Sequence, residues 1–154
     1  MHYVWFGFGK TSEIKYNGLD FVIMIAIKKD AEDKFRKDVY KSKRKAISDV
    51  WFGELLDSVV DVVRFAPSGC NTQPWIVENK NDEISVYRYK EVGKRGVMPI
   101  DKVTFSNRID IGILMLFVEL SLKHQGYQFE RSIYDVFKVN DETEGVLIAR
   151  YKLG

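Results

Sequence analysis

The stretch at residues 65–75 interrupts the chain between an apolar helical segment and an apolar strand, and it contains two prolines, one glycine, three small polar residues and two carboxamides. Pro67 prevents the preceding helix from continuing far, because proline lacks the amide donor that the next helical turn requires. A turn of this composition is suited to holding backbone groups against a ligand. An ordinary connection between a helix and a strand explains the same residues, so the pattern leaves both interpretations open.

The segments on either side of this turn have clear periodicity. Residues 54–65 carry apolar side chains at spacings of three and four, which predicts an amphipathic helix with Val60 and Val63 facing the core. After the turn, two short apolar stretches predict a β-hairpin formed by residues 75–78 and 84–89.

The remaining short segments are assigned from apolar runs and charge. Residues 20–27 form a continuous apolar run, which predicts a central strand buried on both faces. The alternating charges of residues 28–45 predict a solvated loop with a helical turn or two, and residues 90–104 predict a long loop. Near the C-terminus, residues 128–134 and 146–152 predict a hairpin that closes the sheet.

Residues 106–125 form the most apolar segment of the chain and predict a helix that is apolar almost all round and ends at Gly126. One domain of 154 residues seldom surrounds such a helix, so we expect a second subunit to cover part of it, which predicts a homodimer. Together the segments predict one α+β domain over residues 1–154, a sandwich in which a mixed, largely antiparallel sheet packs against helices.

The composition excludes several classes of function. A hydrophobic content of 45% argues against disorder, and a formal net charge of +2 indicates neither nucleic acid nor an anionic membrane as a partner. No apolar run approaches the roughly 20 residues that a membrane span needs, and no basic segment followed by an apolar one opens the chain. We therefore expect a cytoplasmic protein without a membrane partner.

The cysteine and histidine content limits the chemistry of the chain. A single cysteine, Cys70, rules out an intramolecular disulfide and fits a reducing cytoplasmic setting. His2 and His124 stand far apart and neither belongs to a metal-binding motif, so no metal site is expected. Because no histidine lies near it in sequence, Cys70 is expected to be a small buried residue of the loop and not a nucleophile.

The turn also carries a resemblance to a known family. Residues 66–75 read Ala-Pro-Ser-Gly-Cys-Asn-Thr-Gln-Pro-Trp and resemble the A-P-S-x-x-N-x-Q-P-W signature of the FMN-dependent nitroreductases. The order of the flanking segments resembles a permuted subfamily of these proteins, in which the loop falls late in the chain. The resemblance implies that the loop lies along the flavin and that its two carboxamides hydrogen-bond the isoalloxazine and ribityl portions. The flavin-binding residues implied in the loop are Pro67, Ser68, Gly69, Asn71 and Gln73.

Two further segments extend the resemblance. Residues 41–45 contain four cations, which a solvated charged face explains by itself. In the nitroreductases, however, a K-x-R-like segment holds the FMN phosphate, which implies that Arg44 binds the phosphate together with Lys41 or Lys43. A bidentate guanidinium and a lysine point charge suit this dianion. Near the start of the chain, Trp5 and Gly7 match a C-W-x-G-G segment that approaches the flavin edge in the family.

Residues 107–112 resemble the R-x-D-x-G-I opening of a family helix. The resemblance implies that Gly112 allows close packing and that Arg108 and Asp110 form a structural pair at the helix N-terminus. We favour this structural role over contact with the flavin, because acidic residues are ordinary near the starts of helices.

The resemblance implies a homodimer that binds FMN in a cleft at the subunit interface, accepts hydride from NAD(P)H and passes electrons to a nitroaromatic compound or a quinone. No catalytic side chain is required, because the flavin carries the chemistry. The family's N-terminal R-R-S-x-R motif has no counterpart in this sequence. Losing two charge-assisted hydrogen bonds of about 1.5–3 kcal/mol each implies that FMN binds weakly or not at all.

The missing motif leaves a second function open. Residues 3–6 are aromatic or apolar with no preceding element to bury them, so we expect this chain to be the C-terminal portion of a longer flavoprotein architecture. The alternative to a flavoenzyme is a non-catalytic dimeric remnant of the same fold, which serves as a binding or structural module.

Overall fold

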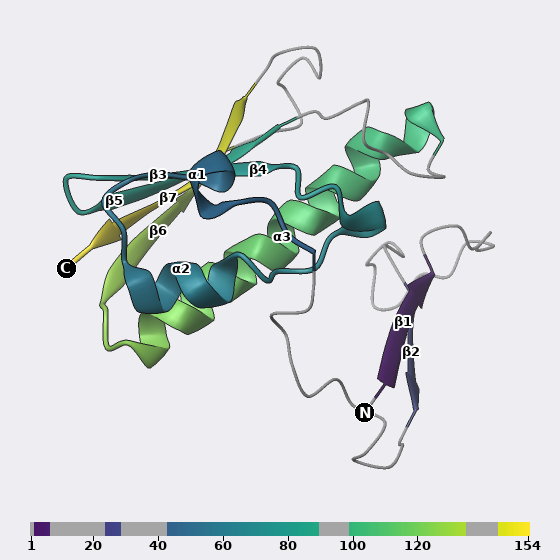
Figure 1. Ribbon diagram of the computed structural model, residues 1–154, viewed down its shortest axis with the longest axis horizontal. Coiled ribbons are helices and arrows are strands. Elements are labelled where there is room, and N and C mark those ends of the chain that lie inside the picture. The colour runs from purple at the N-terminus through teal and green to yellow at the C-terminus, as the bar shows by residue number, and fades with distance from the viewer. Residues whose placement is uncertain (1, 7–23, 29–42, 90–98, 135–144) are drawn as a thin grey trace. The chain divides into compact units, whose positions relative to one another are not determined.

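The computed structural model describes residues 2–6, 24–28, 43–89, 99–134 and 145–154 (Figure 1). The chain divides into two compact units, Met1–Lys41 and Ser42–Gly154, and each is described by itself. Among the described residues, no helix has the length and apolarity needed to cross a membrane.

The first unit contains a two-stranded antiparallel sheet. Strand β1 (His2–Phe6) pairs with β2 (Met24–Lys28), with His2 opposite Lys28 and Phe6 opposite Met24. The prediction of a central strand at residues 20–27 is therefore wrong, since β2 belongs to this two-stranded sheet and not to the larger one. An apolar run indicates that a strand avoids water, but only its backbone partners decide where in a sheet it lies.

The second unit contains a five-stranded sheet with the order β3-β4-β5-β7-β6. Its one parallel pair is β3–β4, while the other three pairs are antiparallel, which confirms a mixed, largely antiparallel sheet. The strands are β3 (Trp51–Gly53), β4 (Trp75–Lys80), β5 (Glu83–Arg88), β6 (Phe129–Ile133) and β7 (Val146–Leu153). The sequence predicts four of these strands, whereas β3 was missed because three residues carry no usable periodicity.

The hairpin β4–β5 shows how local sequence sets the register. Asn81 and Asp82 form its turn with φ angles of 53° and 58°, a left-handed pair that Asn and Asp adopt more readily than most residues. This turn places Trp75 opposite Arg88 and Val77 opposite Val86. The predicted hairpin is confirmed, although β4 ends two residues later than predicted and β5 begins and ends one residue earlier.

Helices pack against this sheet. The helical elements are α1 (Ile47–Val50), α2 (Asp57–Val63), the short 3-10 helix η3 (Gly69–Asn71) and α3 (Ile100–His124). Helices α2 and α3 lie side by side (Figure 1). Helix α2 is shorter than predicted, but Val60 and Val63 are buried as predicted. Helices and strands share one core, which includes Val59, Val60, Val63, Trp75, Val77, Ile84, Val86, Leu114, Val118 and Leu122.

Helix α3 has 25 residues and begins earlier than predicted. It starts directly after Pro99, so the last residues of the predicted loop 90–104 are helical, and Val103 is buried. Proline favours this place because its fixed φ suits a helix start and no helical partner is needed for its nitrogen. Gly126, at φ 84°, follows the C-terminus of α3, as predicted.

Candidate functional site

The loop between α2 and β4 has an unusual backbone. Three of its non-glycine residues adopt the left-handed region, with φ angles of 50° at Cys70, 55° at Asn71 and 47° at Gln73. Each such residue costs on the order of 1 kcal/mol, so the surrounding structure must hold the loop in this conformation. Backbone strain of this kind is concentrated at functional sites in proteins.

Hydrogen bonds within the loop close it on itself. The backbone N–H of Gln73 donates to Ser68 Oγ at 2.9 Å, and the backbone N–H of Asn71 donates to the Ser68 carbonyl at 3.0 Å. The N–H of Thr72 donates to the Gly69 carbonyl at 3.1 Å. Ser68 therefore accepts bonds from two residues that follow it, which shapes the loop as a compact turn.

The cationic segment 43–45 is hydrogen-bonded to the Asn71 and Gln73 part of this loop, here called its outer side. Arg44 Nη1 donates to Asn71 Oδ1 at 2.8 Å, and Asn71 Nδ2 donates to the Lys43 carbonyl at 3.1 Å. Lys45 donates its backbone N–H to Gln73 Oε1 at 3.0 Å and its Nζ to the Gln73 carbonyl at 3.1 Å. The structure thus places the side chain of Arg44, which the resemblance assigned to the flavin phosphate, against the carboxamide of Asn71, which the resemblance assigned to the flavin itself.

The inner side of the loop contacts α3 through Asp110. The backbone N–H of Gly69 donates to Asp110 Oδ1 at 2.8 Å, and the Asp110 residue is fully buried. Burial raises the pKa of Asp110 to about 7, an effect that the Gly69 N–H and the neighbouring Thr72 hydroxyl only partly oppose. The carboxyl group therefore gains a proton near neutral pH.

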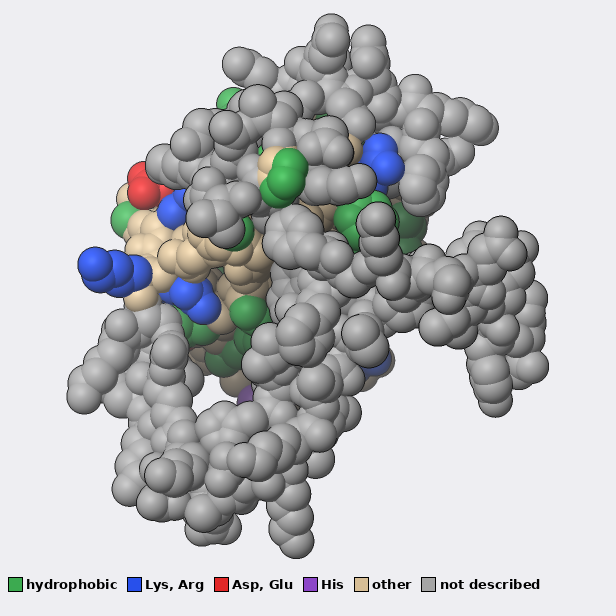
Figure 2. Space-filling model, turned by 90° about the vertical axis from the view of Figure 1, so that its right-hand side faces the viewer, with side chains coloured by type: hydrophobic (Ala, Val, Ile, Leu, Met, Phe, Trp, Pro, Cys, Tyr) green, Lys and Arg blue, Asp and Glu red, His purple; other side chains and the backbone are tan. Residues whose placement is uncertain are grey.

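The hydrogen bonds described above do not include every predicted site residue. Pro67 is half-buried and precedes the bonded turn. Trp5 lies on β1 in the first unit, while Gly7 and Lys41 lie outside the described residues. Figure 2 shows Lys and Arg side chains at separate places on the described surface of one face, with little acidic surface in view. Of the two predicted cations in the described residues, the hydrogen bonds single out Arg44, because Lys43 is bonded to the loop through its carbonyl oxygen.

Cys70 is exposed, so the prediction that it is buried is wrong. Its left-handed backbone reverses the chain at this point and leaves the thiol at the surface of the turn. Among the described residues, no group of three or more His, Cys, Asp and Glu side chains lies close enough to hold a metal ion.

Two predictions for residues 107–112 are wrong: the place of Arg108 and Asp110 at a helix N-terminus and the close packing at Gly112. Because α3 starts at Ile100, Arg108 and Asp110 lie well inside the helix and not at its N-terminus. Among the described residues, no atom lies within 4 Å of a Cβ placed on Gly112, so close packing does not explain this glycine.

Two residues of the site were not singled out as ligands from sequence. Lys45 belongs to the cationic run, but the run does not show which cation reaches the loop. Asp110 carried a usable signal, because Leu114 and Val118 follow it at helical spacing and are buried, so a carboxylate on that face requires a partner.

The chain matches a protein family described as "Putative TM nitroreductase" over residues 3–122. The match includes both the cationic segment and the loop. No curated protein and no solved structure matches the chain.

Proposed function

The chain belongs to the nitroreductase family that it matches, and on this premise we propose that it is an FMN-dependent oxidoreductase that passes electrons from NAD(P)H to a nitroaromatic compound or a quinone. The observation that carries this proposal is the joining of Arg44 to Asn71 at 2.8 Å, across 27 residues of sequence. It places a guanidinium beside the loop that carries the family's signature. We further propose that the domain is a sandwich of the nitroreductase type.

The donors at this site fit FMN. Arg44 is half-buried and Lys43 is exposed, and these cations match a phosphate dianion in charge. Each carboxamide has two donor hydrogens and two acceptor lone pairs. Bonds to described residues leave one Nδ2 hydrogen of Asn71 and one Oε1 lone pair of Gln73 for a ligand. When bound, FMN would supply the hydride and electron transfer.

We assign the groups of this chain as follows. Arg44 and Lys43 would bind the phosphate, and the loop from Pro67 to Gly69 would lie along the flavin. Asn71 and Gln73 would orient the cofactor by hydrogen bonds. None of these residues needs to transfer a proton, which agrees with a site whose chemistry resides in the cofactor.

Replacing Arg44 by alanine is expected to weaken FMN binding about tenfold to hundredfold, because one charge-assisted hydrogen bond is worth roughly 1.5–3 kcal/mol. Asn71→Ala should weaken binding as well, and the two losses should not add fully, since Asn71 also holds Arg44. Titration of FMN by fluorescence quenching measures both affinities.

A matched control for this titration is Lys80→Ala, which removes an exposed cation at the far end of β4. This variant should bind FMN as the parent does. Affinity that is unchanged in Arg44→Ala would remove Arg44 from the site, and unchanged affinity in Asn71→Ala would remove Asn71.

The alternative function, a non-catalytic binding or structural module, is favoured by one observation. The carboxamides of Asn71 and Gln73 already bond the segment 43–45, so the loop has a structural task even without a cofactor. Purification of the protein distinguishes the two functions. Flavin absorbance together with NAD(P)H-dependent reduction of a nitroaromatic compound supports the enzyme, whereas a colourless protein that binds no added FMN supports the module.

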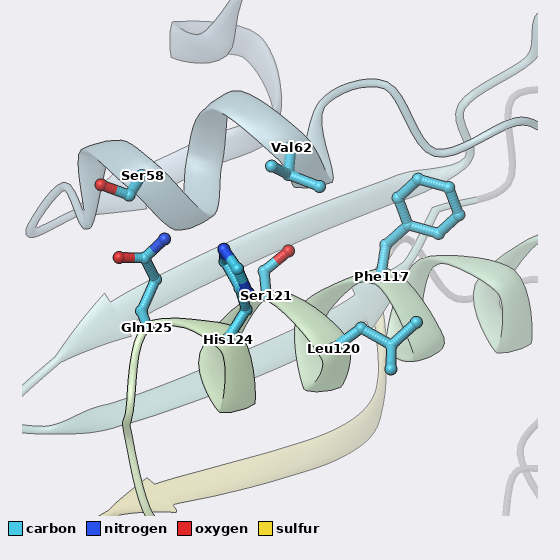
Figure 3. Close-up of a pocket in the computed structure, with 7 residues that line it drawn as sticks. All are labelled: Ser58, Val62, Phe117, Leu120, Ser121, His124 and Gln125. Atoms are coloured by element: carbon cyan, nitrogen blue, oxygen red, sulfur yellow. The ribbon is translucent and has the colours of Figure 1, made fainter.

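We also propose a homodimer, because apolar side chains remain exposed along α2 and α3. Leu116 is 53% exposed, Leu120 57% and Val62 48%. A groove of about 410 Å³ lies between the two helices (Figure 3). Its lining residues are Ser58, Val62, Phe117, Leu120, Ser121, His124 and Gln125. Monomers seldom leave a large apolar surface open to water.

Sedimentation equilibrium at micromolar concentration is expected to show a dimer, and Leu120→Glu is expected to shift it to monomer, because a buried unpaired charge at an interface costs several kcal/mol. Leu55→Glu serves as the control, since Leu55 is as exposed as Leu120 but precedes α2 and does not line the groove. A parent protein that sediments as a monomer would contradict the proposal.

A further inference from the structure

We propose that Asp110 is a positioning residue, which fixes from inside α3 the conformation of the loop Ser68–Gln73 that presents the proposed flavin-binding groups. The expected effect of Asp110 on FMN binding rests on the proposed function. The contact between Asp110 and the loop does not depend on that function. The contact is the 2.8 Å hydrogen bond from the Gly69 N–H to Asp110 Oδ1.

Burying the Asp110 carboxyl group costs free energy, which hydrogen bonds to the loop partly offset. Among the described side chains it is the only buried carboxyl group, and it shares its helix face with the core residues Leu114 and Val118. Removing an ionised carboxylate from water costs several kcal/mol, and a single N–H bond offsets only part of this. The raised pKa of Asp110 reflects the remaining cost.

The bond acts at the point where the loop becomes strained. Gly69 is buried, and the two residues after it, Cys70 and Asn71, both adopt left-handed φ angles. Anchoring the Gly69 N–H therefore determines where the chain reverses and which way Asn71 points. On the outer side, Asn71 in turn holds Arg44 at 2.8 Å.

The two carboxyl oxygens of Asp110 differ in their hydrogen-bond partners. Asp110 Oδ2 is buried and has no hydrogen-bond partner among the described residues. The described contacts of Asp110 are thus with the loop, where the Gly69 N–H bonds Oδ1 and the Thr72 hydroxyl lies nearby. An asparagine at this position would preserve the Oδ1 acceptor, whereas alanine would leave the buried Gly69 N–H without one.

Hydrogen exchange at the Gly69 amide, followed by NMR, tests the proposal without any cofactor. Asp110→Ala is expected to raise this exchange rate about tenfold to hundredfold relative to amides of β5, because a charge-assisted bond is lost. Asp110→Asn is expected to restore protection to within a few-fold of the parent. An unchanged Gly69 rate in Asp110→Ala would overturn the proposal.

A matched control separates local anchoring from general destabilisation. Ser121 is also buried on α3, but it lies eleven residues further along, about 16 Å away at the rise of a helix. Ser121→Ala should leave Gly69 exchange unchanged relative to β5. If Ser121→Ala accelerates Gly69 selectively, the loop responds to any change in α3 and the specific role of Asp110 is refuted.

Two further measurements complete the test. If Asp110→Ala does not fold, the Gly69 amide shift of the parent protein decides: it should follow the titration of the Asp110 carboxyl to which this N–H donates, and a Gly69 shift that stays constant while the Asp110 carboxyl carbon titrates would overturn the proposal. In FMN titrations, Asp110→Ala should weaken binding about tenfold and Asp110→Asn should restore it. A loosened Gly69 with unchanged FMN affinity would refute positioning, whereas a parent that binds no FMN refutes the proposed function and leaves the exchange test of Asp110 intact.

Discussion

The contribution of Asp110 to the free energy of unfolding is expected to fall by about 4 kcal/mol as the pH rises from about 4 to above 7, at about 1.36 kcal/mol per pKa unit. The pKa of Asp110 is about 7 in the folded chain against a reference value of 3.8. Between these values the native state binds more protons than the unfolded state, so stability decreases with rising pH. The cost is absent below the lower value and complete above the higher one.

Asp110→Asn is expected to remove this pH dependence and to be more stable than the parent above pH 7, because no charge is then buried. Urea unfolding at several pH values measures the free energy of both proteins. The difference between them should grow between pH 4 and pH 8 and then level off. Parallel stability profiles for the two proteins would show that Asp110 keeps an ordinary pKa in the fold.

The second large effect is expected at Gly53, where alanine should destabilise the fold by about 2–4 kcal/mol. Gly53 ends β3 with a φ of 85°, and a Cβ placed there would lie 2.0 Å from the Asn79 carbonyl oxygen. That oxygen already accepts the Glu54 N–H at 2.9 Å, and Asn79 Nδ2 donates to the Glu54 carbonyl at 3.0 Å. The backbone cannot move aside without breaking these bonds.

Gly112→Ala provides the matched control for Gly53→Ala. Gly112 is exposed inside α3, and a Cβ there meets no atom within 4 Å among the described residues. Alanine should therefore stabilise the helix by about 0.5–1 kcal/mol. Urea midpoints of the two variants should lie on opposite sides of the parent's, and a Gly53→Ala midpoint equal to that of the parent would contradict the close approach of β3 to Asn79.

Short-range patterns determined much of the fold in advance. The apolar spacing of α2, the turn of the β4–β5 hairpin and the end of α3 before Gly126 all follow from residues a few positions apart. Such features depend on side-chain periodicity and on local backbone preferences, which the sequence displays directly. The family signature in the loop belongs to the same class, since it is a contiguous pattern.

Tertiary structure alone decided where β2 pairs and which residues contact the loop. The bonds that define the site join Arg44 to Asn71 across 27 residues, Lys45 to Gln73 across 28 and Gly69 to Asp110 across 41. No periodicity links positions so far apart, because each bond exists only after packing has brought two elements into contact. For the same reason the sequence did not indicate the exposure of Cys70. It placed Asp110 on an apolar helix face, but the raised pKa of its carboxyl group depends on how completely the packed chain buries it.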